Sequence, residues 1–388
     1  MAKKSNPSPT VRWTCLNIFS LKQKGSISKD GTLFLLITTT GPIILNTIRA
    51  ARKAMATRFE IILHSHQRKD WLQSVAEEIL DEIDRIESQL SRYMPTSQIA
   101  RANRLAALQP VKLDPQVFQL LEDCIQWHQQ TRGAFDITAG PLLKCWGFTD
   151  GQYCEPSRDT IERTLEHVGI HHIQLEPGSH TISFDTEGVT LDLGAVGKGY
   201  AMERAKEILA DYEIESAILH GGTSTICAVG TPPEDVAWHV GIVRPEKDLA
   251  SPFADRSATA QPSNVSDLLT SVALTNASLS ISAVWGKSFQ SGDRTFGHII
   301  DPRNGYPVSG QWLTAIVHEN ALSSDVLTTA MLVDGTQLTE NLSEHLMGKQ
   351  WLMIRQGEEK DTYEVVSQGM GHDPIQGSPS IPESGEAP

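Results

Sequence analysis

Cysteine is scarce in this sequence, and the few cysteines form no recognisable pattern. Five occur in 388 residues, at positions 15, 124, 145, 154 and 227, without a C-x-x-C pair. An odd and scattered set argues against the disulfide framework of a small secreted domain and against the ligand spacing of a zinc site. The chemistry of this chain must therefore depend on other side chains.

Positive charge is also scarce outside the N-terminal segment. The formal net charge is −14. This excludes a broad nucleic-acid surface, because phosphate binding needs a basic face. Residues 1–54 differ from the rest, with nine Lys and Arg against the single Asp30. We therefore predict a basic leader at 1–54 and a separate body that begins at Met55.

The sequence has no long uninterrupted hydrophobic run. The apolar stretch Leu33–Leu45 is broken by three threonines, a glycine and a proline, and it is too short to span a bilayer. A small-residue cleavage site and a cysteine placed for lipid attachment are both lacking. This pattern favours a cytoplasmic protein, with export or membrane anchoring as the alternative. Residues 367–388, rich in Gly, Pro and Ser, predict a disordered tail.

The body between these ends alternates helix and strand patterns. Apolar residues recur every three or four positions from Trp71 to Leu90, which predicts an amphipathic helix. Pro95 breaks this helix beside Tyr93, a ring that either packs in the core or stacks on a planar ligand. Similar apolar spacing and helix-end signals predict further helices at 115–130, 157–168, 200–212 and 336–346. Short apolar runs bounded by turn residues predict strands at 181–184, 189–193, 216–219, 238–243, 272–282, 313–317 and 351–354. The fold class is therefore mixed α/β.

A glycine-rich turn follows the predicted strand at 189–193, in the order L-D-L-G-A-V-G-K-G-Y-A. It is neither a Walker loop nor a G-x-G-x-x-G. A strand, a glycine turn and a helix nevertheless direct free backbone N–H groups and the positive helix end at an anion. Lys198 adds a cation there. The turn predicts phosphate binding, with close packing of the glycines as the alternative.

The stretch Gly297–Gly310 places a histidine before a rigid loop. Its sequence is G-H-I-I-D-P-R-N-G-Y-P-V-S-G, so an apolar pair separates His298 from Asp301 and a turn follows. Histidine is the side chain that changes charge near neutral pH. His298 is therefore a candidate proton acceptor, and a packed structural histidine is the alternative.

The segment S-S-D-V-L-T-T-A predicts the start of a helix, capped by Ser323 or Ser324. Asp325 and Thr329 then lie one turn apart on the same face. Carboxylate and hydroxyl oxygens suit Mg²⁺ or Ca²⁺. The alternative is structural, because an acid in the first turn complements the helix dipole. If Asp325 is a metal ligand, Asp325→Ala is expected to abolish metal-dependent activity while it lowers stability by no more than about 1 kcal/mol, the value of a helix-end charge.

Several blocks together resemble the ApbE family of FAD:protein FMN transferases. They occur in the family's order and span about 55–354: M-A-T, S-R-Y-M-P-T-S-Q-I-A-R-A-N, G-A-F-D-I-T-A-G-P-L-L-K-C-W-G-F, L-D-L-G-A-V-G-K-G-Y-A, H-I-I-D-P-R-N-G-Y-P and S-D-V-L-T-T-A. The resemblance implies a T-fold-related α/β domain at 55–366. It also implies Mg²⁺-dependent transfer of FMN from FAD to a Thr or Ser hydroxyl of a partner flavoprotein, with release of AMP.

The resemblance implies a role for each residue that matches the family's motifs. His298 is the expected base, and the expected metal ligands are the Ala195 carbonyl, Asp325 and Thr329. The expected contacts to FAD come from Met55, Tyr93, Ala134, Phe135, Asp136, Asp192, Lys198 and Ile300.

The chain departs from the family's pattern near the cofactor or acceptor side, at Ile281–Ala283, Trp285, His220 and Gln98. An FAD pyrophosphatase and a non-catalytic FAD-binding protein are therefore the alternative hypotheses.

Overall fold

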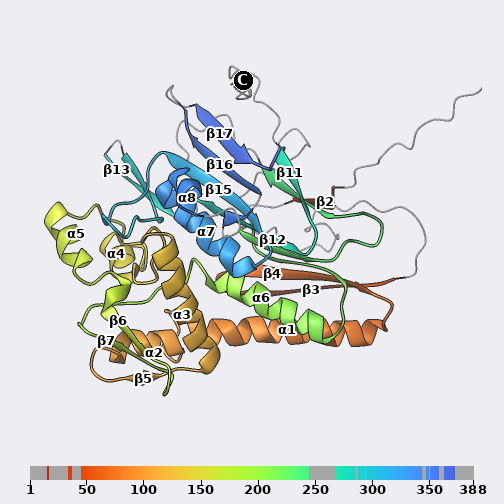
Figure 1. Cartoon of the computed structure of the whole chain (residues 1–388), viewed down its shortest axis with the longest axis horizontal. Coiled ribbons are helices and arrows are strands. Elements are labelled where there is room, and N and C mark those ends of the chain that lie inside the picture. The colour runs from red at the N-terminus through yellow and green to blue at the C-terminus, as the bar shows by residue number, and fades with distance from the viewer. Residues whose placement is uncertain are drawn as a thin grey trace, which may run out of the picture.

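The computed structural model describes residues 15–16, 34–36, 45–243, 268–284, 287–292, 294–342, 347–348, 350–357 and 362–371. An eight-stranded sheet forms the centre of this part of the chain (Figure 1), in the order β17-β16-β15-β12-β9-β8-β4-β3. All its neighbouring strands are antiparallel. Its strands are β3 Asn46–Ala54, β4 Thr57–Ser65, β8 Ser216–Gly221, β9 Thr225–Val229, β12 Ala277–Ala283, β15 Gln311–His318, β16 Gln350–Gln356 and β17 Tyr363–Gln368.

Three helices cover one face of this sheet: α1 Lys69–Leu90, α6 Gly197–Asp211 and α7 Ala321–Asp334 (Figure 1). Strand β4 shows how the sequence builds this layer, because its alternate residues Phe59, Ile61 and Leu63 are each at most 1% exposed and join the core with α1 and α6. Burial of each such side chain contributes about 2 kcal/mol. The sheet therefore holds the helices in fixed positions.

The other face of the sheet carries a second core. Ile62, which points away from the helices, packs in a cluster with Trp238 and Val240 of β10 Trp238–Val243. Strand β10 lies between β11 Leu268–Leu274 and β2 Phe34–Leu36, and β1 Cys15–Leu16 completes this four-stranded sheet.

A further group of elements lies at one end of the central sheet (Figure 1). It includes a three-stranded sheet, four α-helices, a short 3-10 helix and the hairpin β13–β14. The elements are α2 Gln98–Leu105, β5 Val111–Lys112, α3 Pro115–Gln130, α4 Gly140–Cys145, α5 Arg158–Leu165, η1 Ile170–His172, β6 Ile173–Glu176, β7 Thr181–Phe184, β13 Ser288–Ser291 and β14 Arg294–Gly297. Helix α8 Gln337–Asn341 follows α7.

Local sequence signals predict several element ends correctly. The Ser97 hydroxyl accepts from Ala100 N at 2.9 Å at the start of α2, and the Asp114 carboxylate accepts from Gln116 N at 2.9 Å at the start of α3. The chain leaves α3 through Arg132 and Gly133, both with positive φ. The mixed α/β class is confirmed.

Several predicted elements differ from the structure. The sheet begins upstream of Met55, because β3 lies in the predicted leader and pairs along its whole length with β4. The predicted strand at 189–193 pairs with no strand among the described residues; its Asp192 N donates instead to the Ile137 carbonyl at 2.7 Å. The predicted strand at 272–282 is two strands, because the chain turns at Asn276, where φ is 49°.

The ends of the chain are described only in part. Ser367 and Gln368, predicted as the start of the tail, belong to β17, while 372–388 lie outside the described residues. Most of the predicted leader also lies outside them. Within the described ranges, no helix is both long enough and apolar enough to cross a membrane.

Candidate active site

Helices α6 and α7 touch at Gly199, and this contact organises the site. A Cβ on Gly199 would lie 2.4 Å from the Ala321 carbonyl oxygen and 2.9 Å from Leu322 Cα. Such distances are shorter than any side chain tolerates, so glycine is required for the two helices to approach this closely. The glycine-rich turn thus serves close packing, which was the alternative reading of its sequence, and it also positions a carboxylate.

That carboxylate belongs to Asp325, which is 6% exposed. Its Oδ2 accepts from Gly199 N at 2.7 Å, and its Oδ1 accepts from the hydroxyls of Thr225 at 2.8 Å and Ser280 at 2.7 Å. Three donors from three different elements hold an ionised group inside the protein, where an unpaired charge would be costly. Asp325 therefore has a single fixed orientation.

Helix α7 begins earlier than its sequence predicts. Asn320, and not Ser323 or Ser324, is the N-cap, and its side-chain oxygen accepts from Ser323 N at 2.8 Å. Asp325 consequently lies beyond the first turn. Its position is explained by the three donors around it and not by the helix dipole, whose effect falls off within the first turn.

The Ala195 carbonyl precedes α6, whose N-cap is Val196. Among the described residues no backbone donor to this carbonyl is recorded, so its lone pairs can accept a cation. Thr329 lies one turn after Asp325 and donates to its carbonyl at 3.3 Å, so the lone pairs of the Thr329 hydroxyl can still accept.

These groups fit a hard divalent cation. The described part of the chain contains no cluster of three His, Cys, Asp or Glu side chains suited to a metal. The oxygens of Ala195, Asp325 and Thr329 are a carbonyl, a carboxylate and a hydroxyl, the set that Mg²⁺ and Ca²⁺ prefer and that softer metals do not.

The start of α6 lies beside a strained turn. Val196 at the N-cap provides no side-chain acceptor, but Gly197 N donates to the Leu193 carbonyl and Gly199 N donates to Asp325. Of the first three N–H groups of the helix, only that of Lys198 has no recorded partner among the described residues. Met55 Sδ lies 3.9 Å from where a Cβ on Gly197 would be. Met55 and Ala56 form the turn between β3 and β4 with φ of 49° and 58°, which is costly for residues other than glycine. The sheet thus holds Met55 against the start of α6.

Asp192 lies just before the glycine-rich turn, and the Arg92 guanidinium holds its carboxylate. The Arg92 guanidinium is 2.5 Å from Asp192 Oδ2, and Gly194 N donates to Asp192 Oδ1 at 2.7 Å. The same guanidinium lies 5.6 Å from the centre of the Tyr93 ring. Tyr93 is 62% exposed, so the ring is not part of the core and is available to stack on a planar ligand.

His298 follows β14 and is half-buried. Its backbone N donates to the Lys287 carbonyl at 3.0 Å, and its Nδ1 lies 3.2 Å from the same oxygen. The pKa of His298 is lowered to about 4, mainly by burial, with smaller contributions from the positive charges of Lys287 and Lys198; the hydrogen bond to the Lys287 backbone and the charge of Asp192 act in the opposite direction. The imidazole is therefore neutral at pH 7 and can accept a proton.

The loop after α3 supports the site from inside the protein. Ala134 and Phe135 are each 2% exposed. The Asp136 carboxylate accepts from Thr138 N at 2.7 Å and lies 3.1 Å from His128 Nδ1. These side chains point into the interior, so Asp136 is a fixed structural acceptor. Ile300 is also buried, at 7%, in a cluster with Trp146 and Phe148.

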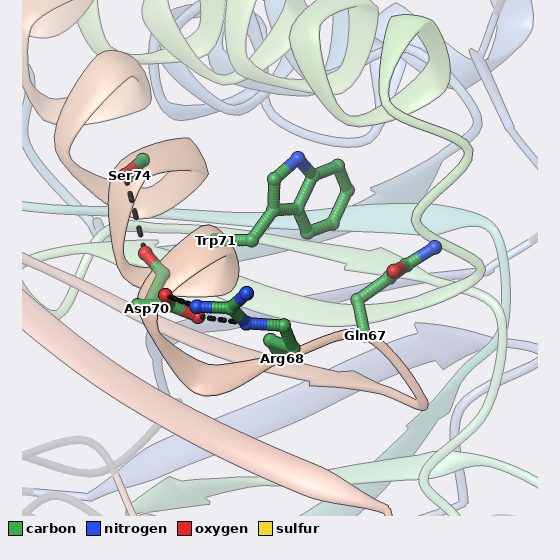
Figure 2. A pocket seen from close by; sticks show the side chains of 5 residues that line it. All are labelled: Gln67, Arg68, Asp70, Trp71 and Ser74. Carbon is green, nitrogen blue, oxygen red and sulfur yellow. Dashed lines mark hydrogen bonds and ion pairs between the residues drawn. The ribbon is translucent and has the colours of Figure 1, made fainter.

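A surface hollow lies far from these residues. It is lined by Gln67, Arg68, Asp70, Trp71 and Ser74 at the start of α1 (Figure 2). The Trp71 ring contacts the ring of Tyr212, which follows the last turn of α6. Since α6 has 15 residues, the hollow is about 20 Å from the glycine turn at the other end of that helix. The hollow therefore lies outside the candidate active site.

Sequence reasoning missed four residues that shape the site: Arg92, Gly199, Thr225 and Ser280. Thr225 and Ser280 are ordinary strand residues in the sequence, and only their pairing across β9 and β12 brings both to Asp325. Gly199 carried a signal, because it belongs to the glycine-rich turn. Among the residues that depart from the family's pattern, Trp285 lies outside the described residues.

The fold is mixed α/β, and helices α6 and α7 cross where Gly199 N donates to Asp325. The chain belongs to the ApbE family, whose profile matches residues 55–352. A FAD:protein FMN transferase of Klebsiella pneumoniae is 27% identical over 277 residues, which is 71% of this chain and 78% of that protein. A FAD:protein FMN transferase of Vibrio cholerae is 23% identical over 269 residues, which is 69% of this chain and 74% of that protein.

Solved structures agree with this fold. An ApbE protein of Thermotoga maritima has a TM-score of 0.69 at 25% identity, with 85% of this chain and 97% of that chain covered. The flavin transferase ApbE of Vibrio cholerae has a TM-score of 0.66 at 21% identity, with 84% and 98% covered.

Proposed function

We propose that this protein is a FAD:protein FMN transferase. It cleaves the pyrophosphate of FAD, transfers the FMN moiety to a Thr or Ser hydroxyl of an acceptor flavoprotein and releases AMP. In this reaction the acceptor oxygen forms a bond to the FMN phosphorus. The bond from that phosphorus to the oxygen of AMP breaks, and AMP leaves with the bonding electrons.

His298 accepts the proton of the attacking hydroxyl. Its low pKa keeps it neutral before the reaction, and its neighbour Lys287 fixes the imidazole through the backbone. A base of such low pKa holds the proton only transiently and passes it to solvent. Its contribution is therefore mainly the placement of the hydroxyl in line with phosphorus.

The start of α6 binds the diphosphate. The Lys198 ammonium and the Lys198 backbone N–H, which has no recorded partner among the described residues, attract its negative charge. Ala195, Asp325 and Thr329 would hold Mg²⁺ beside them. The bound cation would neutralise charge that develops on the phosphate oxygens.

Tyr93 and Met55 are the proposed flavin contacts. The exposed Tyr93 ring offers a flat surface for the isoalloxazine. Asp192 is fixed by Arg92 and lies near enough to His298 to affect its pKa. It therefore borders both the flavin and the base.

One observation carries this proposal. Lys198 lies close enough to His298 to lower the pKa of the imidazole, and the next residue, Gly199, donates to Asp325. A single turn thus connects the base, the anion-binding helix end and the candidate metal ligand. Phosphoryl transfer is accelerated when a base is positioned together with groups that neutralise phosphate charge.

The test is incubation with FAD, Mg²⁺ and a flavoprotein that carries an acceptor Thr or Ser. Covalent flavin on the acceptor, seen by in-gel fluorescence, and an equal amount of AMP are expected. An acceptor with that hydroxyl replaced by Ala is the control. AMP formed at the same rate without acceptor would instead identify an FAD pyrophosphatase. FAD binding without AMP would identify a non-catalytic flavin-binding protein.

A further inference from the structure

The Asp325 carboxylate is unequally engaged on its two oxygens. Oδ1 accepts two hydrogen bonds, from the hydroxyls of Thr225 and Ser280, and Oδ2 accepts one, from Gly199 N. A carboxylate has about two lone-pair sites on each oxygen. Oδ1 is therefore filled, and a single site remains, on Oδ2.

The two hydroxyl donors are held by the sheet itself. Thr225 on β9 and Ser280 on β12 are directly opposite each other in the antiparallel pair, so both side chains point to the same face. Both are completely buried. Neither hydroxyl can turn to water, and each has one proton to donate.

A third hydroxyl adjoins these bonds. Ser324 Oγ lies 2.7 Å from Ser280 Oγ and 2.9 Å from the Ala321 carbonyl, which can only accept. Ser324 can donate to Ser280, and the Ser280 hydroxyl then donates its own proton to Asp325 Oδ1 at 2.7 Å.

We propose that Thr225 and Ser280 determine cation specificity by restricting Asp325 to one-oxygen coordination through Oδ2. This inference rests on the metal role proposed above for Asp325. Mg²⁺ demands a compact octahedral shell and takes single carboxylate oxygens, whereas the larger Ca²⁺ commonly takes both oxygens of a carboxylate. Blocking Oδ1 therefore disfavours Ca²⁺. Thr225 and Ser280 are positioning residues, because they act through Asp325.

The test compares the dissociation constants of Mg²⁺ and Ca²⁺ for the full chain by titration calorimetry. The variants are Thr225→Val, Ser280→Ala and their combination. Thr225→Val keeps the shape of the side chain and removes only the hydroxyl. We expect the combined variant to bind Ca²⁺ more tightly relative to Mg²⁺, because Oδ1 becomes free to bind the cation. The ratio of the Ca²⁺ dissociation constant to the Mg²⁺ dissociation constant should fall by at least about tenfold.

Ser278→Ala is the matched control. Ser278 is buried two residues earlier on the same face of β12, and its hydroxyl is not bonded to Asp325. It should leave the ratio within about twofold. Thr225→Ser, which keeps a hydroxyl, should restore the wild-type ratio.

Two outcomes would overturn the proposal. In one, both affinities fall in parallel with an unchanged ratio, which means that the hydroxyls merely support the fold. In the other, neither affinity changes. If Thr225→Val and Ser280→Ala bind too weakly for calorimetry, the change in melting temperature caused by each cation provides the same comparison. Flavin transfer by the wild type is measured separately, so a protein that selects Mg²⁺ but transfers no flavin refutes only the proposed function.

Discussion

Gly199 and Asp325 are joined by a 2.7 Å hydrogen bond from the Gly199 backbone N to Asp325 Oδ2. The two residues are 126 positions apart in the sequence. This bond links the first turn of α6, which belongs to the glycine-rich turn, to the second turn of α7, which contains Asp325. One contact thus orients the proposed metal ligand Asp325 against the start of α6.

Substitution of Gly199 tests the importance of this contact. Gly199→Ala places a methyl group 2.4 Å from the Ala321 carbonyl, so α6 and α7 must separate. We expect a loss of about 1–3 kcal/mol in the free energy of unfolding, together with a large loss of Mg²⁺ affinity. Urea denaturation and metal titration measure the two effects.

Gly197→Ala is the control for helix composition. A Cβ at Gly197 meets nothing closer than Met55 Sδ at 3.9 Å, which is ordinary contact. Its stability should stay within about 1 kcal/mol of the wild type or improve. Equal destabilisation of both variants would show that the crossing at Gly199 has no special role.

Asp325 variants should separate metal binding from folding. The sequence alone suggested a cost of about 1 kcal/mol for Asp325→Ala. The structure revises this value, because the substitution leaves three buried donors unpaired. We expect roughly 3 kcal/mol or more. Asp325→Asn retains an acceptor oxygen, so it should be more stable than Asp325→Ala while it also loses Mg²⁺-dependent transfer. Equal stability of the two variants would contradict this account.

The pH dependence of transfer should reveal the unusual histidine. Since the pKa of His298 is lowered to about 4, the neutral form predominates at all pH values well above 4. The rate should therefore stay flat from about pH 8 to pH 5.5, whereas an ordinary histidine would lose activity below about pH 6.5. The measurement is kcat/KM against pH with saturating Mg²⁺. A midpoint near pH 6.5 would contradict a lowered pKa for His298. The variant His298→Gln should lose most of the transfer rate and should show no pH dependence from this residue.

His64 should make folding stability depend on pH. It stacks on Trp238, and burial lowers its pKa to about 4, with a further contribution from Arg49. The unfolded chain, with an ordinary pKa near 6.5, binds the proton more readily below that pH. Stability is therefore full above about pH 6.5 and falls as the pH decreases toward 4, by at most about 3 kcal/mol from this group.

The melting temperature of His64→Gln provides the check. This variant has no proton to bind at position 64, so its melting temperature should fall less than that of the wild type between pH 6.5 and 4.5. Parallel curves would assign the acid sensitivity to other groups. His298 contributes in the same direction, because its pKa is also lowered, so the variant curve should retain some slope.

The sequence alone determined the parts that depend on neighbouring residues. The spacing of apolar residues predicts α1, and the caps Ser97 and Asp114 predict the starts of α2 and α3, because these signals act within one or two turns. The ordered motifs also identified the ApbE family. The sequence also marks His298, Asp325 and the glycine-rich turn as candidate site residues.

The tertiary structure decided which of these residues meet. Thr225 and Ser280 reach Asp325 only because β9 and β12 pair in one particular register. Arg92 reaches Asp192, a hundred residues away, only because α1 ends beside the extended segment before α6. Such contacts arise from strand register and helix crossing, which are set by packing of the whole core. Local sequence patterns carry no information about them.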